Sequence, residues 1–476
     1  MLRRILFGAI KQKSGVKLYS KLVVRTKYDD RVDLVRLRKL CDEKIDKLGF
    51  PSCTNDFLKR KSRVVWTKNP TVGELLHNHR EFASREVVAC ACTGFDLPQS
   101  GGHVRCRLSE LADIDPMLMN AKNVPRCVKE RRERNLKKEI EDGFTMWKQG
   151  RDTSVEVELK EVKLCMNGRG QVGGELELES VLKLKRRFEG LVFTSVDRNP
   201  GETCIMCPLL YYEGMQTMFL KNEGYVFDER SEDRFWDESY DEYVEAGLGQ
   251  LGKWKMTGGT GKSYVIPKHK DLGSFQPIYP TFREPMNVTS KRMARALNLL
   301  LNTLPDKEHF NLQAVSGLAE RLTKANKSFG QMGTDTRILA ASYDVKDMFS
   351  RLPHREIITA VDWLVNWHRE RGRKVVRVNP RGKGAVFDCK TKDSWWAVSL
   401  QEIRGFVAFD LEHTVTVASG LMLRQTIGVP MGKSTSPPLA CIMCAYAEWR
   451  FLDFGPSKEE GGGCTFGRRC FLVCGI

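Results

Sequence analysis

The stretch at residues 425–448, QTIGVPMGKSTSPPLACIMCAYAE, constrains the fold of this chain more than any other. Two glycines, Gly428 and Gly432, flank a Val-Pro-Met sequence and let the backbone pass close to a flat partner with no side chain in between. The two prolines at 437–438 suit the first turn of a helix, where the N–H group that proline lacks has no partner. The pattern therefore predicts a tight turn and then a helix over 439–448. An ordinary loop leading into a buried helix is the alternative interpretation.

A second informative stretch, RILAASYDVKDMFSRLP, occupies residues 337–353. Residues 339–343 have the composition of a strand, and Asp344 stands where that strand ends. A carboxylate in this position reaches a cation while the sheet holds its backbone. Asp347 and Phe349 follow at three and five positions. Taken alone, the pattern around Asp344 favours a residue that caps the start of a helix.

Together these two stretches resemble two conserved blocks of reverse transcriptases. The first resembles motif B, QxxGxPMGxxxSPxLA, and matches it at Gln425, Gly428, Pro430, Met431, Gly432, Ser436, Pro437, Leu439 and Ala440. The second, YDVKDMFSRLP, resembles motif A, D-[IVL]-x-x-x-[FY]-x-x-[IL]-P. Motif A precedes motif B in this chain as it does in the family. The resemblance implies an α+β right-hand polymerase with fingers and palm.

The resemblance also implies roles for particular residues. Asp344 would bind the catalytic Mg²⁺ pair, with Mn²⁺ as an alternative, and the carbonyl of Val345 would be a further ligand. Phe349 would be the steric gate against a ribose 2′-hydroxyl. The segment from Gly428 through Pro430 and Met431 to Gly432 would lie against the template and the incoming base, and Asp347 and Gln425 would also contact template or substrate. Two divalent ions suit this chemistry because phosphoryl transfer needs charge neutralised at the attacking and the leaving oxygen.

Two weaker matches concern the fingers. Residues 192–212 predict a strand, a turn and a strand, and the turn resembles a D-K/R-N-x-G turn of Penelope-like and of algal or organellar reverse transcriptases. By that resemblance Arg198 would contact the triphosphate. Residues 263–278 resemble the next fingers block, but Gln276 stands where the family has arginine. Lys268 and Lys270 would supply charge nearby.

The family's motif C, an Asp-Asp on a hairpin after motif B, is not found between residue 449 and residue 476. We therefore expect a chain that stops before motif C, with the thumb absent, and in which the machinery for nucleotidyl transfer is incomplete. The YDD at 28–30 lies in a polar setting, with no permuted block around it, and does not replace motif C. The alternative to a polymerase is a catalytically dead nucleic-acid-binding remnant of a retroelement enzyme.

Composition favours polyanionic partners. The 476 residues carry a net charge of +17, and basic side chains gain binding energy by releasing counterions from a phosphate backbone. The expected partners are an RNA template, a DNA primer and dNTP. No apolar run is long enough for a membrane span, and nothing indicates a protein partner. Residues 1–27 are basic and acid-free, which suits a mitochondrial transit peptide or a basic arm; the location, mitochondrial or nuclear, stays open.

The fifteen cysteines are scattered without even spacing, which disfavours a secreted disulfide framework. The pairs Cys204/Cys207 and Cys441/Cys444 have ligand-like spacing, but they lie in a strand-like and a helical segment, and no fourth ligand stands beside Cys464, Cys470 and Cys474. A zinc site is not favoured. The sequence TGGTGK at 257–262 lacks the spacing of a phosphate-binding P-loop.

The chain divides by pattern into four regions: an N-terminal region of unknown role at 1–120, a basic helical segment and fingers at 121–335, a palm at 336–450 and a Gly/Cys-rich tail at 451–476. Helices are predicted within 32–47, 121–148, 226–246, 290–304 and 354–371. A strand is predicted at 154–165, and 174–183 suits either strand or helix.

Overall fold

The computed structural model forms two compact units. Unit 1 comprises Met1–Asn78 and Cys90–Cys207, and unit 2 comprises His79–Ala89 and Pro208–Ile476. The residues that the structure describes are 21–148, 155–166, 176–305, 309–330 without 313 and 315, 345–388, and 392–454 without 393, together with 5, 7, 8 and 12. Among the helices of these residues, none has both the length and the apolar character that a bilayer crossing needs.

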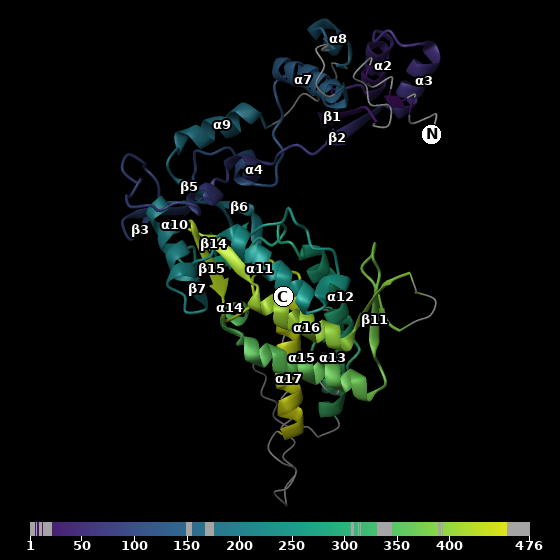
Figure 1. Cartoon of the computed structure of the whole chain (residues 1–476). Helices are drawn as coiled ribbons and strands as arrows, with labels where there is room; N and C mark the ends of the chain where they lie inside the picture. The colour runs from purple at the N-terminus through teal and green to yellow at the C-terminus, as the bar shows by residue number, and fades with distance from the viewer. Residues whose placement is uncertain are drawn as a thin grey trace, which may run out of the picture. The chain divides into compact units, whose positions relative to one another are not determined.

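One part of unit 1 is a small helical cluster on a two-stranded parallel sheet (Figure 1). Strands β1 (Val23–Lys27) and β2 (Arg63–Thr67) pair with each other, and α7 (Lys129–Lys148) packs on β1. The helices α2 (Leu34–Asp46), α3 (Ser52–Lys61) and α8 (Leu159–Leu164) complete this cluster. The predictions of helices within 32–47 and 121–148 are confirmed. The side chain of Asp33 caps α2 by accepting the backbone N–H groups of residues 35 and 36.

The prediction of a strand at 154–165 is wrong, because its second half forms the helix α8. Glu158 and Glu161 form a reciprocal capping box that starts this helix. Val157 and Val162 are both fully buried. Val157 lies in the extended segment before α8, and Val162 lies on the buried face of α8 itself. The ambiguous segment at 174–183 leads into a helix, α9 (Leu178–Arg187).

The other part of unit 1 is a four-stranded antiparallel sheet. Its order is β3 (Gln99–Ser100), β4 (His103–Arg107), β6 (Asn199–Met206) and β5 (Val192–Val196), with α4 (Val72–Leu76) and α6 (Pro116–Met119) beside it. The predicted hairpin at 192–212 is confirmed for its two strands, which pair antiparallel around the turn at Asp197 and Arg198. Its second strand ends at Met206, however, and Pro208 starts a helix.

Unit 2 contains a four-stranded sheet whose strands are far apart in the sequence. The order is β7 (Tyr225–Phe227), β15 (Leu421–Gln425), β14 (Val415–Ala418) and β8 (Gly261–Lys262), antiparallel except for β14 with β8. Ser419 and Gly420, both at positive φ, join β14 to β15 as the two-residue turn of a hairpin. A second hairpin consists of β9 (Tyr264–Pro267) and β10 (Phe275–Ile278).

Helices form the main core of unit 2. α15 (His354–Glu370) contacts α16 (Leu400–Glu412) and α17 (Ser436–Phe454), and α12 (Asn287–Asn302) packs on all three (Figure 1). A three-stranded sheet of β12 (Ala385–Phe387), β11 (Val375–Val378) and β13 (Trp396–Ser399) adjoins α12. The remaining helices are α5 (His79–Phe82), α10 (Pro208–Met215), α11 (Glu232–Glu245), α13 (Ser316–Gly330) and α14 (Met348–Arg351).

The helix predictions within 226–246, 290–304 and 354–371 are confirmed, although α12 starts three residues before the range predicted for it. In α15 the buried residues Ile357, Val361, Leu364 and Val365 recur at helical spacing and face the core. The α+β class is confirmed as helices with mostly antiparallel sheets. The predicted strand at 339–343 lies outside the described residues, and the division into four functional regions stays a prediction.

Candidate functional site

The segment 428–432 forms a turn between β15 and α17, as its glycines predict. Gly428 has a φ of 85° and Gly432 a φ of 127°, a region that residues with a Cβ rarely adopt. α17 then starts at Ser436, so Pro437 and Pro438 fall in its first turn. This turn is the centre of the candidate site in unit 2.

One side of the turn is joined to the segment that resembles motif A. The N–H of Gly428 donates to the carbonyl of Leu352 at 2.7 Å, and the N–H of Val429 donates to the carbonyl of Phe349 at 2.6 Å. A Cβ on Gly428 would lie 2.6 Å from the Phe349 carbonyl oxygen, closer than any side chain tolerates. Nε2 of His354 lies 2.8 Å from the carbonyl oxygen of Gly428. Glycine at 428 is therefore required by both conformation and space.

The other side of the turn is joined to the segment after β10. The N–H of Tyr279 donates to the carbonyl of Met431 at 2.8 Å, and Oγ1 of Thr281 donates to the carbonyl of Gly432 at 3.1 Å. A Cβ on Gly432 would overlap the carbonyl oxygen of Tyr279. The side-chain amide of Gln276 contacts the sulfur of Met431. Three segments singled out from the sequence thus meet at one turn.

Behind the turn lies a buried ionic cluster. Nζ of Lys433 is 2.9 Å from Oδ1 of Asp410 and 3.6 Å from Oε2 of Glu284, and all three side chains are at most 2% exposed. Nζ also lies 3.0 Å from Oγ1 of Thr414, and Thr435 donates to Oδ2 of Asp410 at 2.7 Å. The cluster fixes the entry to α17 against the last turn of α16, where a cation is favoured by the helix dipole.

Burial and ion pairing have opposite effects on the pKa values of Glu284 and Lys433. Burial raises the pKa of Glu284 to about 7, against the opposing attraction of Lys433. Burial alone would lower the pKa of Lys433, but the carboxylates of Asp410 and Glu284 outweigh it and raise that pKa. Lys433 therefore stays charged, and its closest carboxylate partner is Asp410.

The residues predicted to contact template differ in exposure. Gln425 is only 2% exposed, and its Nε2 donates to the carbonyl of Ile427, so this side chain supports the turn from within. Pro430 is buried too, and its carbonyl accepts from Oγ of Ser436. Met431 is half-buried and Gly432 is exposed. The surface of the turn is therefore formed by Met431 and Gly432.

The predicted metal ligands are described only in part. Asp344 lies outside the described residues. Val345 is exposed, and Asp347 has a φ of 52° with its carboxylate 4.0 Å from Nε of Arg351. Phe349 is half-buried against the helical core. Of the predicted Mg²⁺ ligands, the described residues therefore include only the carbonyl of Val345.

The predicted phosphate-contacting cations fall in different units. Arg198 belongs to unit 1, at the hairpin turn between β5 and β6, with a φ of 60° and a side chain that is 70% exposed. Lys268 and Lys270 belong to unit 2, in the loop between β9 and β10, where Lys268 is half-buried and Lys270 is exposed. Their predicted roles stay predictions.

Sequence reasoning missed a basic pocket in unit 2. It measures about 190 Å³, and its lining includes Arg80, Lys262, Tyr264, Phe282 and Arg283. The guanidinium of Arg80 lies 5.0 Å from the centre of the Tyr264 ring, and Phe282 is 68% exposed. Cations beside exposed aromatic rings are typical of sites for nucleotides and single-stranded nucleic acid. No sequence pattern finds this pocket, because Arg80 is far from the other residues along the chain.

The pocket adjoins the turn through a short segment. Pro280, which also lines the pocket, lies between Tyr279 and Thr281, the two residues that hydrogen-bond to Met431 and Gly432. Lys262 lies in β8 and pairs with β14, as an extended residue rather than as part of a P-loop. This agrees with the failure of the P-loop spacing in the sequence.

The YDD at 28–30 is engaged in unit 1. Arg31 forms two side-chain hydrogen bonds to the carboxylate of Asp29, at 2.9 and 2.8 Å, and Arg132 lies 3.7 Å away. Asp30 pairs with Arg126 at 3.0 Å. Both carboxylates are therefore committed to arginines.

The cysteine pairs do not form sites by themselves. Cys204 is buried inside β6, and Cys441 and Cys444 lie half-buried in α17. Cys207 instead gathers with Cys90, Cys92 and His103. The local signal for this group is a Cys-x-Cys with a histidine eleven residues on, but the last member follows more than a hundred residues later.

Comparison with known proteins gives structural likenesses only. A scan of protein-family models finds no match, and no curated protein sequence is significantly similar to this chain. Telomerase from Candida tropicalis, truncated from its C-terminal domain, aligns with 71% of this chain at 12% identity, with a TM-score of 0.41. The apo telomerase of Candida tropicalis aligns with 68% of this chain at 14% identity, with a TM-score of 0.40. Telomerase from Candida albicans in complex with a TWJ fragment of telomeric RNA aligns with 63% of this chain at 14% identity, with a TM-score of 0.35. The chain spans 59% of the first of these structures and 49% of each of the other two.

Proposed function

We propose that unit 2 is the template- and nucleotide-binding core of a reverse transcriptase, which transfers nucleotides to a primer 3′-hydroxyl as an RNA template directs. The observation that carries this proposal is the meeting of three segments, 276–281, 349–354 and 428–433, at one glycine turn. Two of them resemble motif A and motif B, and hydrogen bonds between backbone groups join them directly. The proposed partners are an RNA template, a DNA primer and dNTP.

In this proposal the turn provides a surface for a flat base. Met431 is half-buried and Gly432 is exposed, so the backbone at Gly432 is open to such a base. Phe349 would exclude a 2′-hydroxyl, and its backbone is fixed to the turn through Val429. Preorganisation of this kind holds a substrate in a reactive geometry at little cost when it binds.

The basic pocket would hold the phosphates. Arg80, Lys262 and Arg283 supply three cations in one lining, and Tyr264 and Phe282 offer rings for stacking. Asp344 and the carbonyl of Val345 would hold Mg²⁺, which when bound favours deprotonation of the 3′-hydroxyl and neutralises the departing pyrophosphate. Arg198 and the two lysines at 268 and 270 are proposed as further phosphate contacts.

The test is primer extension by the purified chain on an RNA template annealed to a DNA primer, with dNTPs and Mg²⁺ or Mn²⁺. Because the Asp-Asp of motif C is not found in this sequence, we expect weak incorporation, and a further fall by a factor on the order of 10³ in Asp344→Asn, which loses the charge that would hold the metal. Asp237→Asn is the matched control, since Asp237 is an exposed carboxylate on α11. Equal incorporation by both variants would refute the role of Asp344.

A nucleic-acid-binding protein without turnover is the second candidate. Two observations favour it: the net charge of +17, and the pairing of the buried Asp410 carboxylate beside the turn with Lys433. It predicts salt-sensitive binding of RNA without incorporation in either metal. Replacing Arg283 by Gln should then lower the slope of log K against log salt by about one. A chain that neither incorporates nucleotides nor binds RNA would refute both candidates.

A further inference from the structure

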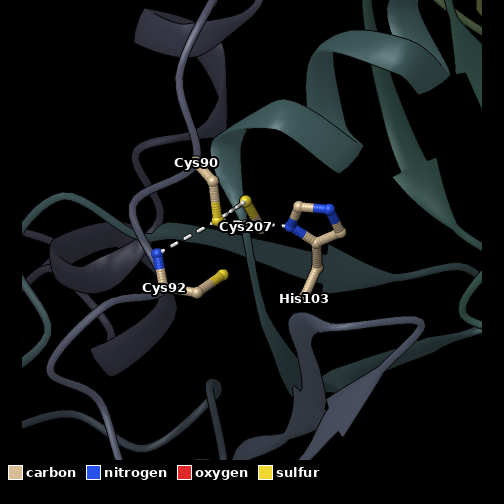
Figure 2. A group of neighbouring side chains, drawn as sticks. All are labelled: Cys90, Cys92, His103 and Cys207. Atoms are coloured by element: carbon tan, nitrogen blue, oxygen red, sulfur yellow. Dashed lines mark hydrogen bonds between the residues drawn. The ribbon is translucent and has the colours of Figure 1, made fainter.

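Three cysteines and one histidine of unit 1 bring their ligand atoms together at one end of its four-stranded sheet. The sulfurs of Cys90, Cys92 and Cys207 and one ring nitrogen of His103 all lie within 4.8 Å of one another. Figure 2 shows the three sulfurs and the imidazole ring directed toward a common centre. We propose that this group is a structural zinc site with three thiolate ligands and one imidazole ligand.

The distances fit a tetrahedral ion. Bond lengths of about 2.3 Å for Zn–S and about 2.0–2.1 Å for Zn–N place two sulfurs about 3.8 Å apart, and a sulfur and a nitrogen about 3.5 Å apart. The Sγ atoms of Cys90 and Cys207 are separated by 3.6 Å, and Sγ of Cys90 lies 3.2 Å from Nδ1 of His103. Shifts of a few tenths of an ångström would accommodate the ion.

Two of the ligands are placed by the sheet. His103 is the first residue of β4, and Cys207 directly follows β6, the strand that pairs with β4. The N–H of Cys207 donates to the carbonyl of Val104 at 2.9 Å, which extends this pairing to the ligand itself. The two side chains therefore come from neighbouring positions on hydrogen-bonded backbone, as a preformed metal site requires.

The other two ligands come from an irregular segment. Residues 83–98 contain neither helix nor strand, and Cys90 and Cys92 lie in the middle of them. Connections of this length without secondary structure are uncommon in compact domains unless something else fixes them. The N–H of Val104 donates to Sγ of Cys92 at 3.2 Å, and the N–H of Cys92 donates to Sγ of Cys90 at 3.4 Å. Such bonds orient thiolates and support their negative charge when a metal is bound.

The donor set and its exposure define the class of metal. Three soft sulfurs and one imidazole suit Zn²⁺ and do not suit Mg²⁺ or Ca²⁺, which prefer oxygen. Four protein ligands leave no open position, so the site is structural and not catalytic. Cys92 and Cys207 are buried while Cys90 is exposed, which gives the ion a way in from solvent. Binding would release the thiol protons to solvent.

The first measurement is the zinc content of the purified full chain by mass spectrometry of the metal. We expect one zinc per chain, and a loss of at least tenfold in zinc affinity in Cys90→Ser and in His103→Ala. Cys127→Ser is the matched control, because Cys127 is a partly exposed cysteine of the same unit outside the group. Zinc content that is unchanged in both ligand variants would overturn the proposal.

A second measurement uses the wild-type chain and therefore does not depend on whether the ligand variants fold. Co²⁺ added to metal-free wild-type chain should produce the intense visible bands of a tetrahedral thiolate site, and Zn²⁺ should abolish them. Unlike His103→Ala, His103→Cys should still bind Co²⁺, with bands shifted toward those of a four-sulfur site. A chain that takes up neither metal, or that holds Cys90 and Cys207 as a disulfide in place of the metal, would refute the site. The result is independent of whether unit 2 extends primers.

Discussion

The N–H of Val429 donates to the carbonyl oxygen of Phe349 at 2.6 Å, so the centre of the glycine turn is fixed to the residue that we propose as the steric gate. Because the bond joins two backbones, side-chain changes at either residue leave it in place. A change in backbone conformation would break this hydrogen bond, and a substitution at the neighbouring Gly428 would cause such a change.

Gly428→Ala should destabilise unit 2 by about 2 kcal/mol or more, because a Cβ at positive φ is strained and would also strike the Phe349 carbonyl. Gly405→Ala is the control. Gly405 lies inside α16 with open space around it, so its replacement should stabilise the chain by about 0.5–1 kcal/mol. Urea unfolding of both variants measures the difference. Equal effects would mean that the turn is not under the constraint described.

Lys433→Met should cost about 3–5 kcal/mol, since it leaves the buried carboxylates of Asp410 and Glu284 without their cation. The loss should be larger at alkaline than at acidic pH, because burial raises the pKa of Glu284 and so favours its protonated form, which needs no cation. The exposed Lys253 provides the control: Lys253→Met should change the unfolding free energy by less than about 0.5 kcal/mol. A small, pH-independent effect at Lys433 would contradict the ionic cluster.

His354 should make the turn sensitive to acid. Burial lowers the pKa of His354 below its usual 6.5; Lys433 and Arg424 lower it further, while the bond to Gly428 and the charge of Glu412 oppose this. The unfolded chain therefore binds a proton more readily, so the stability contributed by neutral His354 is complete above about pH 6.5 and is lost as the pH falls below it. His354→Gln keeps a donor and should flatten this dependence in urea titrations. His269→Gln, at an exposed histidine, should not.

Asp29→Asn should destabilise unit 1 by about 2–3 kcal/mol at neutral pH, because Arg31 and Arg132 lose a buried partner. Burial would raise the pKa of Asp29, but the hydrogen bonds and charges of these arginines outweigh it and lower that pKa. The carboxylate's contribution is therefore present above the usual pKa of about 3.9 and is lost in stronger acid.

Asp30→Asn is the control for Asp29, because the side chains of Asp30 and Arg126 are 37% and 32% exposed and their ion pair should be worth less than about 1 kcal/mol. Thermal unfolding at neutral pH compares the two variants. A loss of primer extension from either variant without a loss of stability would instead assign a catalytic role to the YDD.

Individual helices and turns were predictable from the sequence where one local pattern was much stronger than its competitors. The glycines at 428 and 432 predicted the turn, the helical spacing of apolar residues predicted α15, and the turn residues at 197 and 198 predicted the hairpin. The segment at 154–165 misled, because a capping box at Glu158 and Glu161 outweighs a short apolar alternation. Local competition of this kind is decided by hydrogen bonds that hydrophobic spacing does not encode.

The assembled sites were predictable only in part. Resemblance to a family identified motif A and motif B, but no signal in the sequence indicated that Lys433 is buried with two carboxylates. The basic pocket and the cysteine–histidine group each unite residues more than a hundred positions apart. Such groupings depend on tertiary folding, and spacing rules that search short windows cannot find them.

The bonds around the glycine turn also bear on the order in which unit 2 folds. Thr281 and Gly432 are separated by 151 positions, and His354 and Gly428 by 74. Contacts this distant gain nothing until long loops have closed, so they tend to form after local helices and hairpins. During synthesis, the carbonyl of Phe349 and the N–H of Tyr279 must wait for residues 428–432 to emerge. We therefore expect the proposed site to form late in folding, after the core of unit 2.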